Sequence, residues 1–472
     1  MFDFMGSSQR LSVSDPASRT SATANRSMRW PRIAVTAVFV VHGLLFASWT
    51  AHIPDVKAHL GLTDGTLGFA LLGAPVGSVM AMIVASWLLP RVGSRAVVRV
   101  ALVGYCAAGP LVGLTGSLPA LFAALFAWGA FQGTLDVAMN TQAIAVERTG
   151  GRLLMSGLHG SWSIGAFAGA GIGALAVAAG ITLSLQLLVM GTVALLVAGL
   201  LTAQMLPVAA EHPGGNVGSD RNGPERAGPD SHGGPDSHGS PDSHGGRDAE
   251  AGPDAEAGPD AEAGPVKRAG AAASRWSGGM VMLGAIAFAS MLCEGAIADW
   301  GAVYLSGPLH ASGVVPGLGY TAFSLAMVTV RLSGNRLLTR FRTDRLLPVL
   351  AAVATLGFAA ALVIASPPAA LVGFCCLGIG LASVVPAVFS AAGRIPGLSA
   401  GTAVATASAC GWAGFVCGPP LIGRLASWAS LPVALGLLPL LTAFVVAGTL
   451  SSRGLRDRRP RQHEDLGQGA AL

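Results

Sequence analysis

A long apolar segment with polar residues inside it decides the fold class of this chain. Residues 118–130 read LPALFAALFAWGA, and residues 131–151 continue with FQGTLDVAMNTQAIAVERTGG. The first part suits lipid, whereas the second places Gln132, Asp136 and Asn140 at four-residue intervals, on one helix face. At a rise of about 1.5 Å per residue, Asp136 lies about 18 Å from Arg148, near mid-membrane. A carboxylate there costs about 2.5–3.5 kcal/mol, so Asp136 is expected to face a cavity, a partner or a bound solute.

The overall composition is that of a membrane protein. Of the 472 residues, 52% are hydrophobic and 11% are charged, against about 25% charged in an average soluble domain. The net charge of +5 comes from arginines scattered beside apolar runs, which argues against nucleic-acid binding. The six cysteines lie in apolar runs without metal-ligand spacing, so they are expected to pack and to bind no metal.

Twelve apolar runs are long enough to span a bilayer. They lie near residues 33–53, 67–89, 96–114, 119–146, 153–179, 182–206, 278–304, 318–339, 346–366, 370–391, 401–423 and 431–450. The sequence therefore predicts an all-α integral membrane protein with a six-helix bundle at 33–207 and another at 277–451. A disordered N-terminus (1–32), a disordered linker (208–276) and a tail (452–472) complete the expected domains.

The linker carries six tandem hexapeptides, from GPDSHG at residue 228 to GPDAEA at residue 258. The regular spacing of His232, His238 and His244 would suit a metal, but nothing preorganises these ligands, so an expanded sequence repeat is favoured.

Arginines near the span ends set the topology. With a cytoplasmic N-terminus, the inside collects nearly all of them, and the outside keeps only Lys57 and Arg424. Both termini and the linker are therefore expected in the cytoplasm, and the protein in the plasma (inner) membrane. The two halves also repeat: ASWTAHI from Ala47 matches ADWGAVY from Ala298, and LGF from Leu67 matches LGY from Leu318, at one offset of 251. Parallel repeats of this kind build transporters with a site between the halves.

These features resemble the major facilitator superfamily, whose loop between spans 2 and 3 carries a basic motif. SWLLPRVGSR, from Ser86, matches it at Arg91, Gly93 and Arg95, with Pro90 in place of the acid. GNRLLTRFR, from Gly334, repeats it with Arg336 and Arg340. The resemblance implies that these residues gate the cytoplasmic face. The strings SWTAHIPDVKAHLGLTDGTLG, DVAMNTQAIAVER, SGLHGSWSIGAFAGAG and CEGAIADWGAVYL resemble a permease branch loosely allied to the fucose and proton symporters.

A second deep acid lies in the seventh span. Glu294 is about 24 Å from the cytoplasmic start of that span, and Asp299 lies further out beside Trp300, where an interfacial position is expected. Loss of water around a carboxyl group favours its protonated form, which is what proton coupling requires. Asp136 and Glu294 are therefore predicted to form a substrate and proton site, together with Gln132 and Asn140. A permanent structural ion pair is the alternative.

Four other residues are weaker candidates. His42 is expected near mid-membrane, either at the proton site or as a packing residue. Trp49 could stack on a solute or anchor at the interface. His159, near the inner end of span 5, suits a gate or a helix cap better than substrate contact. Arg331 is expected to reach the cytoplasm or pair with an acid, with a substrate or gating role as the alternative.

Together these features predict a monomeric, proton-coupled transporter of a small polar organic solute. It would need no cofactor other than the proton gradient, because no GxxxxGK[ST] loop occurs in the sequence. A proton-driven exporter of drugs or metabolites is the alternative. A non-transporting sensor or a membrane enzyme is disfavoured, since no output domain or catalytic constellation is apparent.

Overall fold

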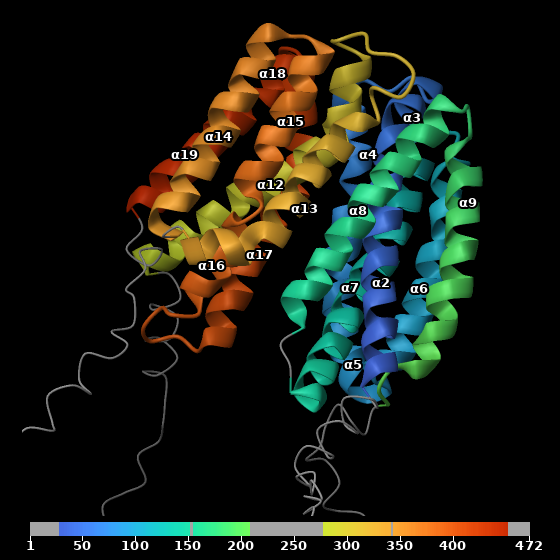
Figure 1. Cartoon of the computed structure of the whole chain (residues 1–472). Helices are drawn as coiled ribbons and strands as arrows, with labels where there is room; N and C mark the ends of the chain where they lie inside the picture. Colours follow the sequence, from blue (N-terminus) through green and yellow to red (C-terminus); the bar gives the residue numbers. More distant parts are fainter. Residues whose placement is uncertain (1–27, 152–153, 208–276, 341–342, 452–472) are drawn as a thin grey trace, which may run out of the picture.

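The computed structural model describes residues 28–151, 154–207, 277–340 and 343–451 (Figure 1). The expected linker with its hexapeptides, the tail and most of the N-terminal segment lie outside the described residues. Within them the chain is helical, in two bundles.

The first bundle contains six spans, several of them divided. Its elements are α2 (Arg29–Ser48) with η1 (Thr50–His52) and α3 (Ile53–His59), α4 (Asp64–Leu71) with α5 (Gly73–Val92), α6 (Ser94–Val112), α7 (Leu118–Gly150), α8 (Met155–Ala178), and α9 (Leu183–Ala194) with η2 (Leu195–Gly199) and η3 (Thr202–Gln204). Helix α2 begins ahead of the expected start at residue 33.

The second bundle repeats this order. Its elements are α12 (Gly278–Ser306), α13 (Leu318–Arg340), α14 (Thr343–Ile364), α15 (Pro367–Leu381) with α16 (Val384–Ala392), α17 (Ala400–Trp428), and α18 (Leu431–Leu435) with α19 (Leu437–Ser451). Eleven helical segments among the described residues are long and apolar enough to cross a membrane. Helix α13, with 23 residues, takes the place of the expected eighth span. The predicted all-helical membrane fold is confirmed.

Local sequence explains where the spans start and break. Ser117, Thr182, Ser277 and Ser399 each accept a hydrogen bond from a backbone N–H in the first turn of the helix that follows. Proline explains a break: Pro386 lacks the N–H that would bond the Ala382 carbonyl, and the chain turns between α15 and α16 at this point.

Glycines allow the first and fifth spans of each bundle to pack closely. A Cβ atom at Gly165 of α8 would lie 2.1 Å from the carbonyl oxygen of Val40 on α2. In the second bundle a Cβ atom at Gly414 of α17 would lie 2.2 Å from the carbonyl oxygen of Phe288 on α12. The first and fifth spans therefore pack in the same way in both halves of the repeat. Only glycine allows the two helix backbones to come this close.

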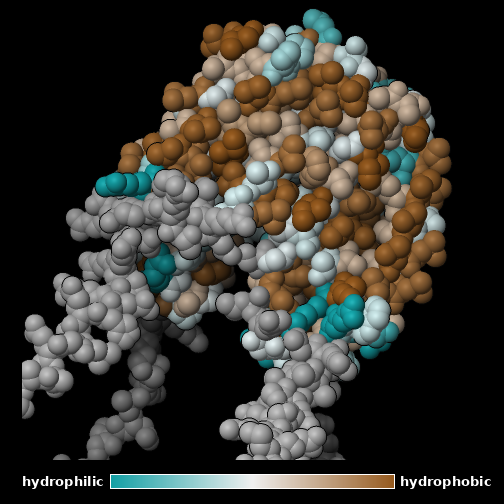
Figure 2. Space-filling view, in the orientation of Figure 1, coloured by the Kyte–Doolittle hydropathy of each residue, from teal (hydrophilic) through white to brown (hydrophobic). Residues whose placement is uncertain are grey.

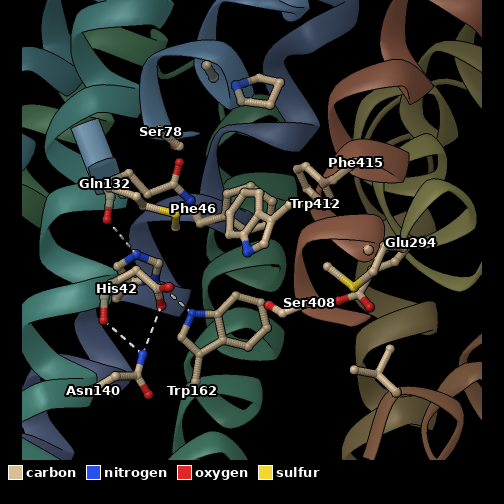
Figure 3. A pocket seen from close by; sticks show the side chains of 18 of the residues that line it. His42, Phe46, Ser78, Gln132, Asn140, Trp162, Glu294, Ser408, Trp412 and Phe415 are labelled. Carbon is tan, nitrogen blue, oxygen red and sulfur yellow. Dashed lines mark hydrogen bonds between the residues drawn. The ribbon is translucent and has the colours of Figure 1, made fainter. Parts of the chain in front are cut away.

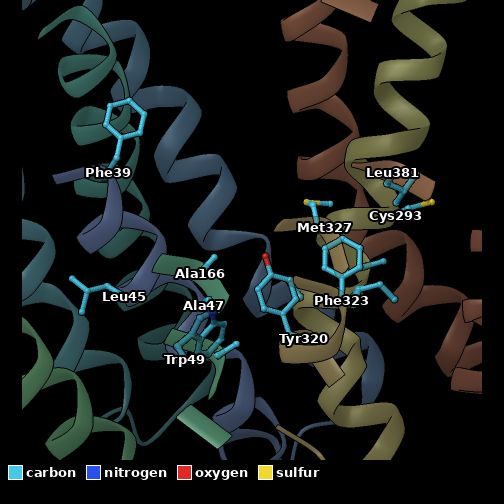
Figure 4. Packing of buried hydrophobic residues seen from close by; sticks show 14 of the residues in the cluster. Phe39, Leu45, Ala47, Trp49, Ala166, Cys293, Tyr320, Phe323, Met327 and Leu381 are labelled. Atoms are coloured by element: carbon cyan, nitrogen blue, oxygen red, sulfur yellow. The ribbon is translucent and has the colours of Figure 1, made fainter. Parts of the chain in front are cut away.

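Buried hydrophobic side chains pack within the bundles (Figure 4). Tyr320 of α13 stacks on Phe323, with ring centroids 5.7 Å apart, and meets Phe46 of α2 edge-on at 6.3 Å across the two halves. Apolar residues cover most of the visible flank (Figure 2), as a lipid-facing surface requires.

The two bundles meet most closely at the end away from the chain termini. There α4 packs on α17, and a Cβ atom at Gly68 would lie 2.5 Å from the Pro419 carbonyl oxygen. A Cβ atom at Gly317, before α13, would lie 2.5 Å from the Cβ of Ala174 on α8. In Figure 1 the bundles converge at the top and diverge toward the side where the termini leave.

Candidate functional site

A cavity of about 380 Å³ lies between the two bundles, near the middle of the spans (Figure 3). The first bundle contributes lining residues from α2, α5, α7 and α8, and the second from α12, α13, α16 and α17. Its polar and charged lining residues are His42, Ser78, Gln132, Asp136, Asn140, His159, Glu294, Asp299, Arg331 and Ser408. Its aromatic lining residues are Phe46, Trp49, Trp128, Trp162, Phe389, Trp412 and Phe415.

Helix α7 presents the predicted polar face to this cavity. Gln132, Asp136 and Asn140 all line it, as their four-residue spacing requires. The Asn140 side-chain amide donates to the Asp136 backbone carbonyl at 2.8 Å and to Oδ1 of the Asp136 carboxylate at 3.3 Å. This amide orients the carboxylate and adds no charge, so Asp136 stays available to a proton or a solute.

His42 is hydrogen-bonded through both ring nitrogens (Figure 3). Its Nδ1 lies 2.8 Å from Nε1 of Trp162, and its Nε2 lies 3.3 Å from the Gln132 carbonyl oxygen. Because an indole N–H can only donate and a carbonyl can only accept, Nδ1 is unprotonated and Nε2 carries the hydrogen. The neutral imidazole thus ties α2 to α7 and α8, and it holds Trp162 at the cavity wall.

Two acids of α12 reach the cavity from the second bundle. Neither Glu294 nor Asp299 has a hydrogen bond or an ion pair with any residue that the structure describes. The expected interfacial position of Asp299 is wrong: its neighbours Trp300 and Tyr304 are fully buried. The cause is cover from the other bundle, because η1 and α3 pack on α12 at this end.

Arg331 also differs from expectation, since it neither reaches the surface nor pairs with a described acid. Its Nη1 donates to Ser163 Oγ at 2.8 Å, which joins α13 to α8. Its Nε donates to the Ala382 carbonyl at 3.3 Å. That carbonyl is the acceptor left without a helical partner by Pro386, so the proline creates the place that Arg331 fills.

The structure places the remaining candidates on the walls. Trp49 is buried and meets Trp128 edge-on, with ring centroids 6.1 Å apart, so it is not an interfacial anchor. His159, expected at a gate or cap, lines the cavity and meets Phe39 edge-on at 5.5 Å.

Several lining residues were not singled out from the sequence. An aromatic cluster crosses both halves, with neighbouring ring centroids 5.8 to 6.3 Å apart; its members are Trp162, Phe46, Phe415 and Trp412. Trp162 lies within the string SGLHGSWSIG, which was singled out for its resemblance to permeases, so this string could have pointed to Trp162 as a lining residue. Trp412 and Phe415, three residues apart on α17, share a helix face, but this spacing equally suits core packing.

Of the predicted gating residues, His159 and Arg331 line the cavity, whereas Arg91, Gly93 and Arg95 lie away from it. Gly93 joins α5 to α6 with φ of +77°, a conformation that favours glycine. The Arg91 guanidinium lies 3.9 Å from the Trp87 ring centre, and Arg95 donates to the Ala203 carbonyl at 2.8 Å. These contacts stay within the first bundle. Arg336 and Arg340 lie on α13, and their side chains are outside the described residues.

Known proteins share both the sequence pattern and the fold of this chain. The model of the Major Facilitator Superfamily matches residues 34–395. An uncharacterized MFS-type transporter of Yersinia pestis is 32% identical over 418 residues, which is 88% of this chain and 94% of the relative. The solved nucleoside transporter NupG superposes with a TM-score of 0.63 at 10% identity, covering 89% of this chain and 98% of NupG. The transporter FucP, in its outward conformation, superposes with a TM-score of 0.53 at 13% identity, covering 90% of this chain and 99% of FucP.

Proposed function

Because the chain belongs to the Major Facilitator Superfamily, it is a membrane transporter and not an enzyme, and we propose that it carries a small polar organic solute together with protons. The solute occupies the cavity between the bundles, and the bundles rock around it to open each side in turn. The energy comes from the proton gradient.

One observation carries this proposal: carboxyl groups from both bundles meet in one central cavity. Asp136 comes from the first bundle, and Glu294 and Asp299 come from the second. A carboxylate without a cationic partner in such a place is costly, so it is retained where it binds and releases protons or a solute. The amides of Gln132 and Asn140 and the hydroxyl of Ser408 supply neutral groups that can bond to solute hydroxyls.

We further propose a plasma-membrane location with both termini and the linker in the cytoplasm. Arg91, Arg95, Arg99 and Arg148 all lie at the ends of spans on the side of the termini, as the excess of arginine on cytoplasmic loops requires. In that orientation the end at which the two bundles diverge faces the cytoplasm.

Charge movement on a solid-supported membrane tests the proposal. Reconstituted protein is exposed to rapid steps of sugars, sugar acids and amines, with empty liposomes as the blank. We expect at least one solute to evoke an inward positive current that grows with an inward proton gradient and is retained in Asp55→Asn, an exposed acid outside the cavity. Electrically silent uptake of a neutral sugar, or uptake of any solute that does not depend on the proton gradient, would contradict proton coupling.

The aromatic walls favour a second candidate, proton-driven export. Seven aromatic side chains surround the cavity, a lining that also suits larger apolar compounds. An exporter would exchange protons for solute in opposite directions. An inward gradient of a neutral solute would therefore evoke an outward proton current.

A further inference from the structure

The cavity has an unbalanced set of charges. Its described lining residues include the three carboxyl groups of Asp136, Glu294 and Asp299, whereas Arg331 is the single lysine or arginine among them. His42 adds no charge, because its two hydrogen bonds fix the neutral imidazole. The acids therefore outnumber the lysine and arginine side chains of these walls by two, and His159 is the remaining titratable base on them.

Two of the three acids lie on the second bundle, and contacts within the described part of the protein leave them without a hydrogen bond. Asp136 receives the Asn140 amide, but Glu294 and Asp299 receive no hydrogen bond within the described part of the chain. Arg331 is itself engaged with Ser163 and Ala382. Arg331 lies within electrostatic range of Glu294 but donates its hydrogen bonds to neutral groups, so the Glu294 carboxylate faces the cavity without a hydrogen-bond donor from the described residues.

Aromatic rings stand around the same space. In Figure 3, Trp412, Phe415 and Phe46 lie between Glu294 and the α7 face. Phe46 and Phe415 are 6.3 Å apart, and Trp412 meets Phe415 at 5.8 Å. Ring faces attract ammonium groups more than they attract anions, and they also provide a flat surface for a ring-shaped solute.

We propose that the solute is a small organic amine whose ammonium group binds Glu294, with its ring against the Trp412, Phe415 and Phe46 cluster. The neutral amides of Gln132 and Asn140 bind the opposite, uncharged end of the molecule. This inference rests on the proposed function and names the substrate class of the same cavity. The acids that do not hold the ammonium group remain for protons.

Two matched ligand triads test the inference by binding alone. One is glucosamine, glucose and glucuronate, and the other is benzylamine, benzyl alcohol and benzoate. In each triad the ring is constant and the charge changes from positive through neutral to negative. Purified protein in detergent is titrated with each compound, and the thermal unfolding shift and the tryptophan fluorescence report binding.

We expect the amine of at least one triad to bind roughly ten- to hundredfold more tightly than its neutral partner, the range typical of a hydrogen bond to a charged group. Glu294→Gln should remove that preference, while Asp55→Asn, with its 64% exposed side chain, should keep it. Equal binding of amine and alcohol, preferred binding of the carboxylates, or no binding of either amine at millimolar concentration would each overturn the proposal. If Glu294→Gln fails to fold, the relative affinities of the wild-type protein for the amine, the alcohol and the carboxylate still decide whether the proposal holds.

The outcome separates this inference from the proposed function. Amine binding without any amine-evoked current and without any change of luminal pH would leave the inference intact and overturn proton-coupled transport. A proton-coupled current evoked by neutral sugars, with no preference for amines, would do the reverse.

Discussion

At the scale of single residues, His42 shows how a titratable side chain can serve a membrane protein as a link between helices. Its two hydrogen bonds join three helices and orient Trp162 toward the cavity. A proton on Nδ1 would break the bond from the Trp162 indole, because both nitrogens would then donate. His42 therefore acts as a positioning residue for the aromatic wall.

Replacement of His42 by leucine should destabilise the protein and loosen Trp162. The indole N–H and the Gln132 carbonyl would both lose a buried partner, at a cost of about 1–3 kcal/mol. Thermal unfolding in detergent and the emission maximum of Trp162 would report the change, with exposed His59→Leu as the control. A melting temperature equal to that of the control would contradict the positioning role.

Helical periodicity made part of the polar lining of the cavity predictable from the sequence. Gln132, Asp136 and Asn140 share a face by spacing alone, and the structure places that face on the cavity. Asp299 was misassigned because its depth was counted along one helix, whereas its burial comes from α3 of the other bundle. Trp412 and Phe415 escaped notice because an aromatic pair at helical spacing also describes an ordinary core.

At the scale of elements, the break between α15 and α16 is tied to Arg331. Pro386 frees the Ala382 carbonyl, and Arg331 occupies it. A double-mutant cycle of Pro386→Ala with Arg331→Met should show coupling of about 0.5 kcal/mol or more, because a restored backbone N–H replaces the guanidinium. The free energies of unfolding would be measured in mixed micelles. Additive effects of the two substitutions would refute this link.

The contact between α2 and α8 provides a second prediction. A Cβ atom at Gly169 would lie 2.1 Å from the Leu44 carbonyl oxygen, whereas at Gly171 nothing lies within 4 Å. We expect Gly169→Val to destabilise the protein by about 1–3 kcal/mol or prevent its folding. Gly171→Val, on the same helix, carries the same loss of glycine without the clash. Similar unfolding curves for both variants would contradict the packing account.

The spans were largely predictable, since apolar length is a local property. The divisions of spans at Leu72 and Ser383 were not, although Pro75 and Pro386 stand just beyond them. A proline within an apolar run is compatible with either a kinked or a divided helix, and tertiary contacts select between them.

At the scale of the whole molecule, the described conformation is closed at the end away from the termini. Gly68 is central to that closure, because its ideal Cβ would lie 2.5 Å from the Pro419 carbonyl oxygen and 3.1 Å from the Gly423 Cα. Lys57 and Asp64 form an ion pair at the same end. That ion pair lies within the first bundle, whereas the contact of Gly68 with Pro419 and Gly423 joins the two bundles, so rocking of the bundles must separate the Gly68 contact when the opposite end closes.

Gly68→Leu should therefore shift the population toward a state open at this end. Spin labels at Asp55 and Arg424, on a background without the native cysteines, would report a longer mean distance than in the unsubstituted protein. Gly116→Leu is the control, because a Cβ atom there meets nothing within 4 Å. An unchanged distance distribution in Gly68→Leu would show that this contact does not hold the closure.

The central claim, that the buried acids couple solute movement to protons, is tested most directly by solute-driven acidification. Proteoliposomes filled with a pH-sensitive dye receive the solute that gives the largest current, in wild-type protein, Asp136→Asn and Glu294→Gln. An asparagine cannot release a proton but keeps the shape of the carboxyl group. We predict that wild-type protein acidifies the lumen, and that Asp136→Asn exchanges labelled solute across the membrane without acidification. Acidification by Asp136→Asn at the wild-type rate would contradict the account.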